Sequence, residues 1–132
     1  MSAPRSQRIL TPMRRVRGLG SAHSGTWHFW HLRVTSVALL SLTTIFIIIV
    51  VSLLGRNHAA VVQVLGSPLV AILMLLFAGT GIYHMWLGMQ EIIIDYVHDE
   101  IPKLLTLMTN TFFCFVIGVC CVFAVLKLSF GV

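Results

Sequence analysis

The chain has 132 residues, of which 58% are hydrophobic and only 10% are charged, and its formal net charge is +5. In soluble domains about a quarter of all residues are charged, so this composition excludes a soluble globular protein and predicts an integral membrane protein. At about 20 residues for each spanning helix, the length allows three crossings and leaves too little chain for a soluble catalytic domain. We therefore predict an all-α membrane protein that is not an enzyme by itself.

Residues 1–24 form a basic, polar tail without apolar periodicity, to which we assign no helix, and residues 25–132 form the membrane domain. The charge of the tail comes from five arginines: Arg5, Arg8, Arg14, Arg15 and Arg17. An Arg-rich tail free of acidic residues is typical of a transit peptide, which would place the protein in the mitochondrial inner membrane. The positive-inside rule instead indicates a bacterial inner-membrane protein with a cytoplasmic N-terminus, and we favour this second interpretation because the tail is short.

The first span is predicted from about residue 32 to 54. Trp27 and Trp30 stand just before this apolar run, as aromatic side chains do at the headgroup level. Arg33 lies at the inner end of the span, where a basic side chain can snorkel to the interface. Gly55 supplies a C-terminal stop, and a short polar connection follows it.

The second span is predicted from residue 68 to 94, because the Ser67-Pro68 pair is typical of a helix N-terminus. The third span is predicted from residue 103 to 126, opened by Pro102. An even number of crossings separates the tail from the loop between these two spans. Both therefore face the cytoplasm or matrix.

His84 is an ionisable side chain deep inside the second span. Placing such a group within the membrane costs at least a few kcal/mol, so its presence there by default indicates a function. Neutral imidazole is a suitable axial ligand for haem iron in a dry pocket. No other histidine lies at that depth, since His28 and His31 sit near the inner interface, so a second ligand would come from another subunit. A hydrogen bond from His84 to another helix is the alternative. If His84 holds a haem, Arg33 either pairs with a haem propionate or only snorkels to the interface.

Asp95 and Tyr96 lie where the second span leaves the membrane. Eleven helical steps separate His84 from Asp95, which places both on one face about 16 Å apart. A phenol can donate a hydrogen bond to a quinone carbonyl, and a neighbouring carboxylate can relay the protons that quinone reduction consumes. The alternative is an interfacial tyrosine beside a solvated aspartate. Glu91, one turn deeper, is a second-line candidate for a proton path, and we favour an interhelical hydrogen bond as its role.

The three cysteines lie in one apolar run without CxxC spacing: Cys114, Cys120 and Cys121. We expect them to be small buried hydrophobes rather than disulfides or metal ligands.

Two stretches together resemble a known family. His84-Met-Trp-Leu-Gly-Met, followed eleven positions after the histidine by Asp95-Tyr96, resembles the signature of the small hydrophobic membrane-anchor subunit of bacterial succinate dehydrogenase. The stretch from Ser24-Gly25 to Arg33-Val-Thr-Ser36 resembles that family's entry to its first helix at matching spacing. The likeness covers the chain from about Gly18 to its end.

The resemblance implies an anchor of succinate:quinone oxidoreductase, respiratory complex II, in which electrons pass from succinate oxidation to quinone. It implies that His84 is one axial ligand of a haem b shared with a second membrane-anchor subunit, the cytochrome b subunit, and that Tyr96 hydrogen-bonds ubiquinone with Asp95 beside it. The two anchors would pack into one helical bundle in the lipid bilayer. Iron-sulfur and flavoprotein subunits would dock on the side that bears the His98 loop, and no nucleic acid is a partner.

Three alternatives stay open. An anchor of a fumarate reductase or another quinone-linked enzyme would use similar groups with electrons flowing the other way. A haem-free structural anchor would use His84 only for a helix-helix hydrogen bond. A small transporter would bind protons or cations at an intramembrane acidic residue, and the first and third spans contain none.

Overall fold

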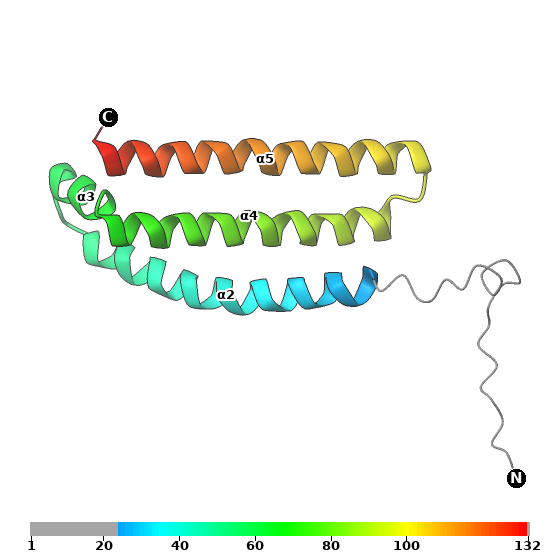
Figure 1. The fold of residues 1–132 in the computed structure, drawn as a ribbon, viewed down its shortest axis with the longest axis horizontal. Helices are drawn as coiled ribbons and strands as arrows, with labels where there is room; N and C mark the ends of the chain where they lie inside the picture. Colours follow the sequence, from blue (N-terminus) through cyan, green and yellow to red (C-terminus); the bar gives the residue numbers. More distant parts are fainter. Residues whose placement is uncertain (1–23, 132) are drawn as a thin grey trace, which may run out of the picture.

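The structure, a computed structural model, describes residues 24–131. This part of the chain folds into four α-helices, which are α2 (Ser24–Leu53), α3 (His58–Leu65), α4 (Pro68–Tyr96) and α5 (Glu100–Phe130) (Figure 1). Helices α2, α4 and α5 are long and apolar enough to cross a membrane. The predicted all-α fold with three spanning helices is therefore confirmed, whereas the helix-free tail falls almost entirely outside the described residues.

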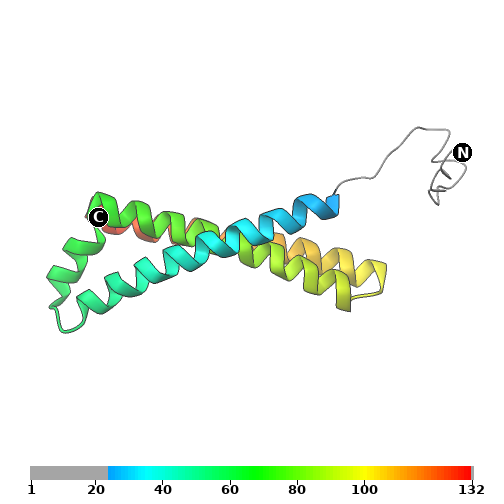
Figure 2. The same ribbon diagram turned by 90° about the horizontal axis from the view of Figure 1, so that it is seen from below.

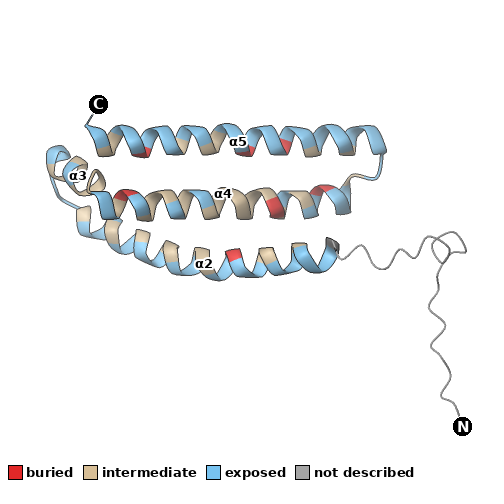
Figure 3. Ribbon diagram, viewed as in Figure 1, coloured by how far each residue is buried: buried red, intermediate tan, exposed pale blue. Residues whose placement is uncertain are grey.

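The three long helices form a single layer with α4 in the middle, in contact with α2 on one side and α5 on the other (Figure 1). Helix α5 runs alongside α4, and α2 crosses α4 obliquely (Figure 2). Buried residues are few and lie on the sides where helices meet, so both faces of the layer consist largely of exposed side chains (Figure 3). In a membrane, such apolar faces contact lipid or the helices of a partner.

Helix α2 begins at Ser24 and not at about residue 32, so Trp27 and Trp30 lie on the helix rather than before it. A helix satisfies its own backbone hydrogen bonds, and it therefore continues through the interfacial region that the apolar run alone did not include. It ends at Leu53, and Gly55 follows with a φ of 76°, as the predicted glycine stop requires.

Helix α3 occupies what we expected to be only a polar connection. The Asn57 side chain accepts a hydrogen bond from the backbone N–H of Ala60 at 2.9 Å, which caps its first turn. At its end, a Cβ on Gly66 would lie 2.7 Å from the backbone oxygen of Leu128, so α3 lies close against the end of α5. An asparagine before a run of alanine and valine was the signal for this short helix.

Helix α4 begins at Pro68 as predicted, but the Ser67 hydroxyl donates to the backbone oxygen of Val64 at 2.7 Å and does not cap α4. It continues to Tyr96, past the expected end at about residue 94. Helix α5 begins at Glu100, two residues before Pro102, which was the expected start. This is possible because proline is tolerated within the first turn of a helix. It ends at Phe130 rather than at about residue 126.

The expectation of buried cysteines holds for Cys114 only. Cys121 is half-buried and Cys120 is exposed, and all three are free thiols. The reason is the single-layer arrangement, which leaves the outer side of α5 without a covering helix.

Candidate functional site

His84 lies on the side of α4 that faces α2, and its Nδ1 is 2.9 Å from Oγ1 of Thr35. Thr35 is only 9% exposed, one of few buried polar residues in the described chain. The two helices are antiparallel, because contacts further along α2 meet residues earlier in α4: Phe46 stacks on Phe77 with ring centroids 4.8 Å apart. Packing of α2 on α4 thus fixes where the imidazole of His84 sits.

The Nε2 atom of His84 has no hydrogen-bond partner among the described residues. It is also not enclosed, since Nε2 of His28 is the one fully buried side-chain nitrogen or oxygen without such a partner in residues 24–131. The imidazole therefore uses Nδ1 to hold a neighbouring helix and leaves Nε2 open at the surface of the layer. An open imidazole nitrogen at membrane depth can act as a ligand to a metal centre.

A second contact between α2 and α4 joins His28 and Glu91, whose Nε2 and Oε1 atoms are 2.8 Å apart. They lie within ion-pair distance but are not aligned for a hydrogen bond. The His28 side chain is largely buried and that of Glu91 is half exposed. Glu91 therefore contacts a second helix, but it does not make the interhelical hydrogen bond that one of its two interpretations predicted.

Asp95 and Tyr96 are the last two residues of α4, and both are exposed, Tyr96 at 79%. Because α4 runs unbroken from Pro68 to Tyr96, the predicted relation holds: Asp95 lies about 16 Å along the axis from His84. Neither side chain has a hydrogen bond to another described residue. They are free to meet a ligand or a partner at this end of the layer.

The loop after α4 brings further polar groups to the same place. His98 donates through Nδ1 to the backbone oxygen of Tyr96 at 3.2 Å, and Lys103 donates through Nζ to that of Ile94 at 3.3 Å. A cation at the C-terminus of a helix is favoured by the helix dipole. The Lys103 charge therefore lies at the end of α4 that carries Asp95 and Tyr96, a placement that the sequence alone did not indicate.

Arg33 is not brought to His84. It is two residues from Thr35, so the two side chains leave α2 on nearly opposite sides, about 200° apart. The guanidinium carbon lies 4.2 Å from the centroid of the Phe29 ring. Arg33 also lines a shallow groove of about 430 Å³ along the outer side of α2, together with Trp30 and Val37.

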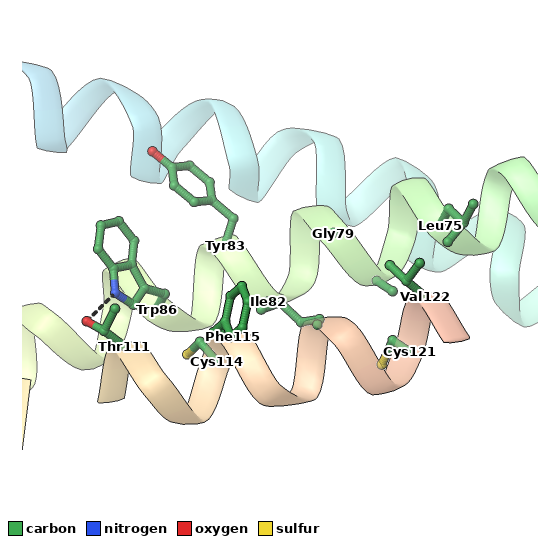
Figure 4. A pocket seen from close by; sticks show the side chains of 12 residues that line it. Leu75, Gly79, Ile82, Tyr83, Trp86, Thr111, Cys114, Phe115, Cys121 and Val122 are labelled. Atoms are coloured by element: carbon green, nitrogen blue, oxygen red, sulfur yellow. Dashed lines mark hydrogen bonds between the residues drawn. The ribbon is translucent and has the colours of Figure 1, made fainter. Parts of the chain in front are cut away.

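A groove of about 350 Å³ lies between α4 and α5 and is lined almost wholly by apolar side chains (Figure 4). Trp86 donates through Nε1 to Thr111 Oγ1 at 3.2 Å, and Asn110 donates through Nδ2 to the Trp86 backbone oxygen at 3.2 Å. These bonds hold α4 against α5. The groove therefore lies on the opposite side of α4 from the contact between His84 and α2.

Sequence reasoning missed two features of this region. One is Thr35, whose bond to His84 no motif in the sequence indicated. The other is a row of aromatic rings from α2 to α4: the His31 ring is tilted against that of Trp27 with ring centroids 3.8 Å apart, and it meets Tyr83 edge-on with centroids 6.2 Å apart. Their signal was the i, i+4 spacing of Trp27, His31 and Thr35, which puts them on one side of α2.

No group of three or more His, Cys, Asp or Glu side chains within residues 24–131 is arranged to hold a metal ion. A haem iron can be held by a single histidine from one chain, so His84 could by itself serve as this chain's contribution. The second ligand would come from a partner.

Comparison with known proteins agrees with the resemblance found in the sequence. The family described as "Succinate dehydrogenase/Fumarate reductase transmembrane subunit" matches residues 7–126. The chain is 32% identical over 124 residues to the succinate dehydrogenase hydrophobic membrane anchor subunit of Paracoccus denitrificans, covering 94% of this chain and 95% of that protein. No solved structure matches the chain. The chain therefore belongs to the family of succinate dehydrogenase/fumarate reductase transmembrane subunits, and it is a multi-pass membrane protein and a non-catalytic subunit of an oxidoreductase.

Proposed function

We propose that this chain is the hydrophobic anchor subunit of succinate:quinone oxidoreductase, contributing one axial ligand of a haem b and part of a ubiquinone site. The observation that carries this proposal is His84, which lies within a spanning helix with Nδ1 bound to Thr35 and Nε2 open. The similarity to a succinate dehydrogenase anchor over nearly the whole chain supports it.

The residues present fit a haem. Nε2 of His84 would hold the iron from one side, and a cytochrome b partner subunit would supply the other ligand and the facing helices. The single layer of α2, α4 and α5 leaves its faces uncovered, as a bundle completed by a second anchor requires (Figure 3). When bound, the haem supplies one-electron redox chemistry; the chain itself supplies the ligand and the apolar surroundings that exclude water.

The quinone site of this proposal is the end of α4. Tyr96 would donate its phenol hydrogen to a quinone carbonyl, and Asp95 would hold or release a proton near the carbonyl that is reduced. Exposure of both side chains fits this role, because a ligand can reach them without disturbing the packing. The Lys103 ammonium nearby favours negative charge at this end.

The proposal also sets the orientation and the partners. The basic N-terminal tail and the loop of His98, Asp99 and Glu100 would face the cytoplasm, with the chain in a bacterial inner membrane. The iron-sulfur and flavoprotein subunits would dock on that side, where electrons could pass to a quinone at Tyr96. Arg33 has no ion pair with a carboxylate among the described residues, and from the outer side of α2 it would offer its charge to a haem propionate that extends away from His84.

A reduced-minus-oxidised optical spectrum of the whole complex, purified through this chain, tests the proposal. We expect a b-type band that is lost or weakened in His84→Ala and retained in the matched control His58→Ala, since His58 is an exposed histidine at the start of α3. Arg33→Ala should have a smaller effect, because a propionate at the interface can be solvated by water. A normal spectrum in His84→Ala would rule out the ligand role.

The family includes fumarate reductase subunits, so the same groups could serve electron flow from quinol to fumarate. Comparing succinate oxidation with quinone and fumarate reduction with quinol in the same purified complex distinguishes the two. Faster succinate oxidation supports the proposed direction, and faster fumarate reduction supports the alternative.

A further inference from the structure

We propose that Thr35 is a positioning residue for His84: its side-chain oxygen holds the imidazole as the Nδ1-H tautomer and so leaves the Nε2 lone pair for the metal. This inference rests on the proposed function for the identity of the metal centre, but the hydrogen bond and the tautomer are properties of this chain alone.

The direction of the hydrogen bond follows from the other contacts of Thr35. Its Oγ1 lies 2.7 Å from the backbone oxygen of His31 and 3.1 Å from that of Leu32. A hydroxyl has one proton, and both carbonyls can only accept it. Threonine in a helix commonly donates to the carbonyl four residues earlier, which here is the shorter contact. The proton between Thr35 and His84 is therefore the one on Nδ1.

The membrane environment favours the same tautomer. A neutral imidazole carries one N–H, and a polar hydrogen left without an acceptor in apolar surroundings is costly. On Nδ1 this hydrogen points at Oγ1 of Thr35, 2.9 Å away. On Nε2 it would have no acceptor in the described part of the chain.

Thr35 is also a rigid partner. Its side chain is branched at Cβ, which restricts χ1, and it is only 9% exposed. Other hydroxyls of α2, such as those of Ser36, Ser41 and Thr44, bond only to the backbone of their own helix. Among these four side chains, Thr35 alone also reaches a second helix.

A hydrogen bond of this kind matters for affinity. Histidine ligands usually donate their second ring N–H to a fixed acceptor, which sets the tautomer and makes the ligand more basic. Loss of such an acceptor typically lowers metal affinity about 10- to 100-fold. Thr35→Val keeps the branched shape but removes the acceptor, so haem affinity of the assembled complex should fall by about this factor.

Two variants separate this role from a packing defect. Thr35→Ser keeps the hydroxyl, so the haem affinity of this variant should stay near that of the original complex. Thr44→Val is the matched control, because Thr44 makes the same bond to the carbonyl four residues earlier, at 2.9 Å, but no bond to α4 among the described residues. It should leave haem affinity unchanged.

The tautomer can be measured without haem. The full chain, labelled with ¹⁵N-histidine and reconstituted in lipid bilayers, gives distinct solid-state NMR shifts for protonated and unprotonated ring nitrogens, and His84→Ala identifies the His84 signals. We expect protonated Nδ1 and unprotonated Nε2 in the original chain, in Thr35→Ser and in Thr44→Val. In Thr35→Val we expect a loss of this preference.

The outcomes judge the two proposals separately. A His84 tautomer that is unchanged in Thr35→Val, or protonated at Nε2 in the original chain, would overturn the role of Thr35. An original complex that carries no haem would overturn the proposed function, whereas the NMR result would still decide whether Thr35 sets the tautomer.

Discussion

Replacing Tyr96 by phenylalanine removes one phenol group and keeps the ring. Tyr96 is 79% exposed and its hydroxyl has no partner among the described residues, so the change should alter the free energy of unfolding by no more than about 0.5 kcal/mol. At a quinone site the loss is larger, because a carbonyl would be left without its donor at a cost of roughly 1 to 3 kcal/mol. This corresponds to roughly a 5-fold to 150-fold loss of quinone turnover.

Two activities of the assembled complex make the assay specific. Succinate oxidation with ubiquinone should fall by this factor in Tyr96→Phe. Succinate oxidation with an artificial acceptor that takes electrons upstream of the quinone should stay at its original rate, because those electrons do not reach this chain.

The second tyrosine provides the control. Tyr83 lies on the same helix, with its ring 5.8 Å from that of Trp86, and its ring points from α4 toward α2 (Figure 4). Tyr83→Phe keeps these ring contacts and should leave both activities unchanged. Equal loss of both activities in Tyr96→Phe would indicate an assembly defect, and full quinone activity would leave Tyr96 as an interfacial anchor only.

Proton handling, packing and orientation can each be tested by a further substitution. Asp95→Asn should slow quinone reduction and flatten its dependence on pH, measured as the quinone-linked rate across a pH series; an equal slowing at every pH would mean that the carboxylate only positions its neighbour. Leu87→Ala should lower the free energy of unfolding in detergent by about 2 to 5 kcal/mol because Leu87 is 0% exposed, while Leu40→Ala, at 72% exposed, should change it little; similar losses in both would contradict the observed packing. A cysteine in place of Arg56 should react only with reagent added outside the cell, and one in place of Glu100 only from the cytoplasmic side. The reverse labelling pattern would invert the proposed orientation.

The existence of three spanning helices was decided by the sequence, because a bilayer demands about 20 apolar residues for each crossing and offers few other folds. The same constraint singled out His84, because an ionisable side chain is costly within a spanning helix. Helical geometry then predicted the distance along the axis between His84 and Asp95. This prediction requires only an unbroken helix between the two residues, and α4 is unbroken there. The predicted ends of the helices were less accurate, since polar interfacial residues continue a helix beyond its apolar run.

Contacts between helices were decided only by the tertiary structure. The spanning helices are apolar around most of their circumference, so periodicity does not tell which side meets a neighbour. Six hydroxyls in the first predicted span could have bonded across to another helix, and only packing at the oblique crossing of α2 over α4 selected Thr35 for His84 and His28 for Glu91. Packing likewise directed Arg33 away from α4, since the side of α2 that faces its neighbour is fixed by which residues interlock and not by the residues' chemistry.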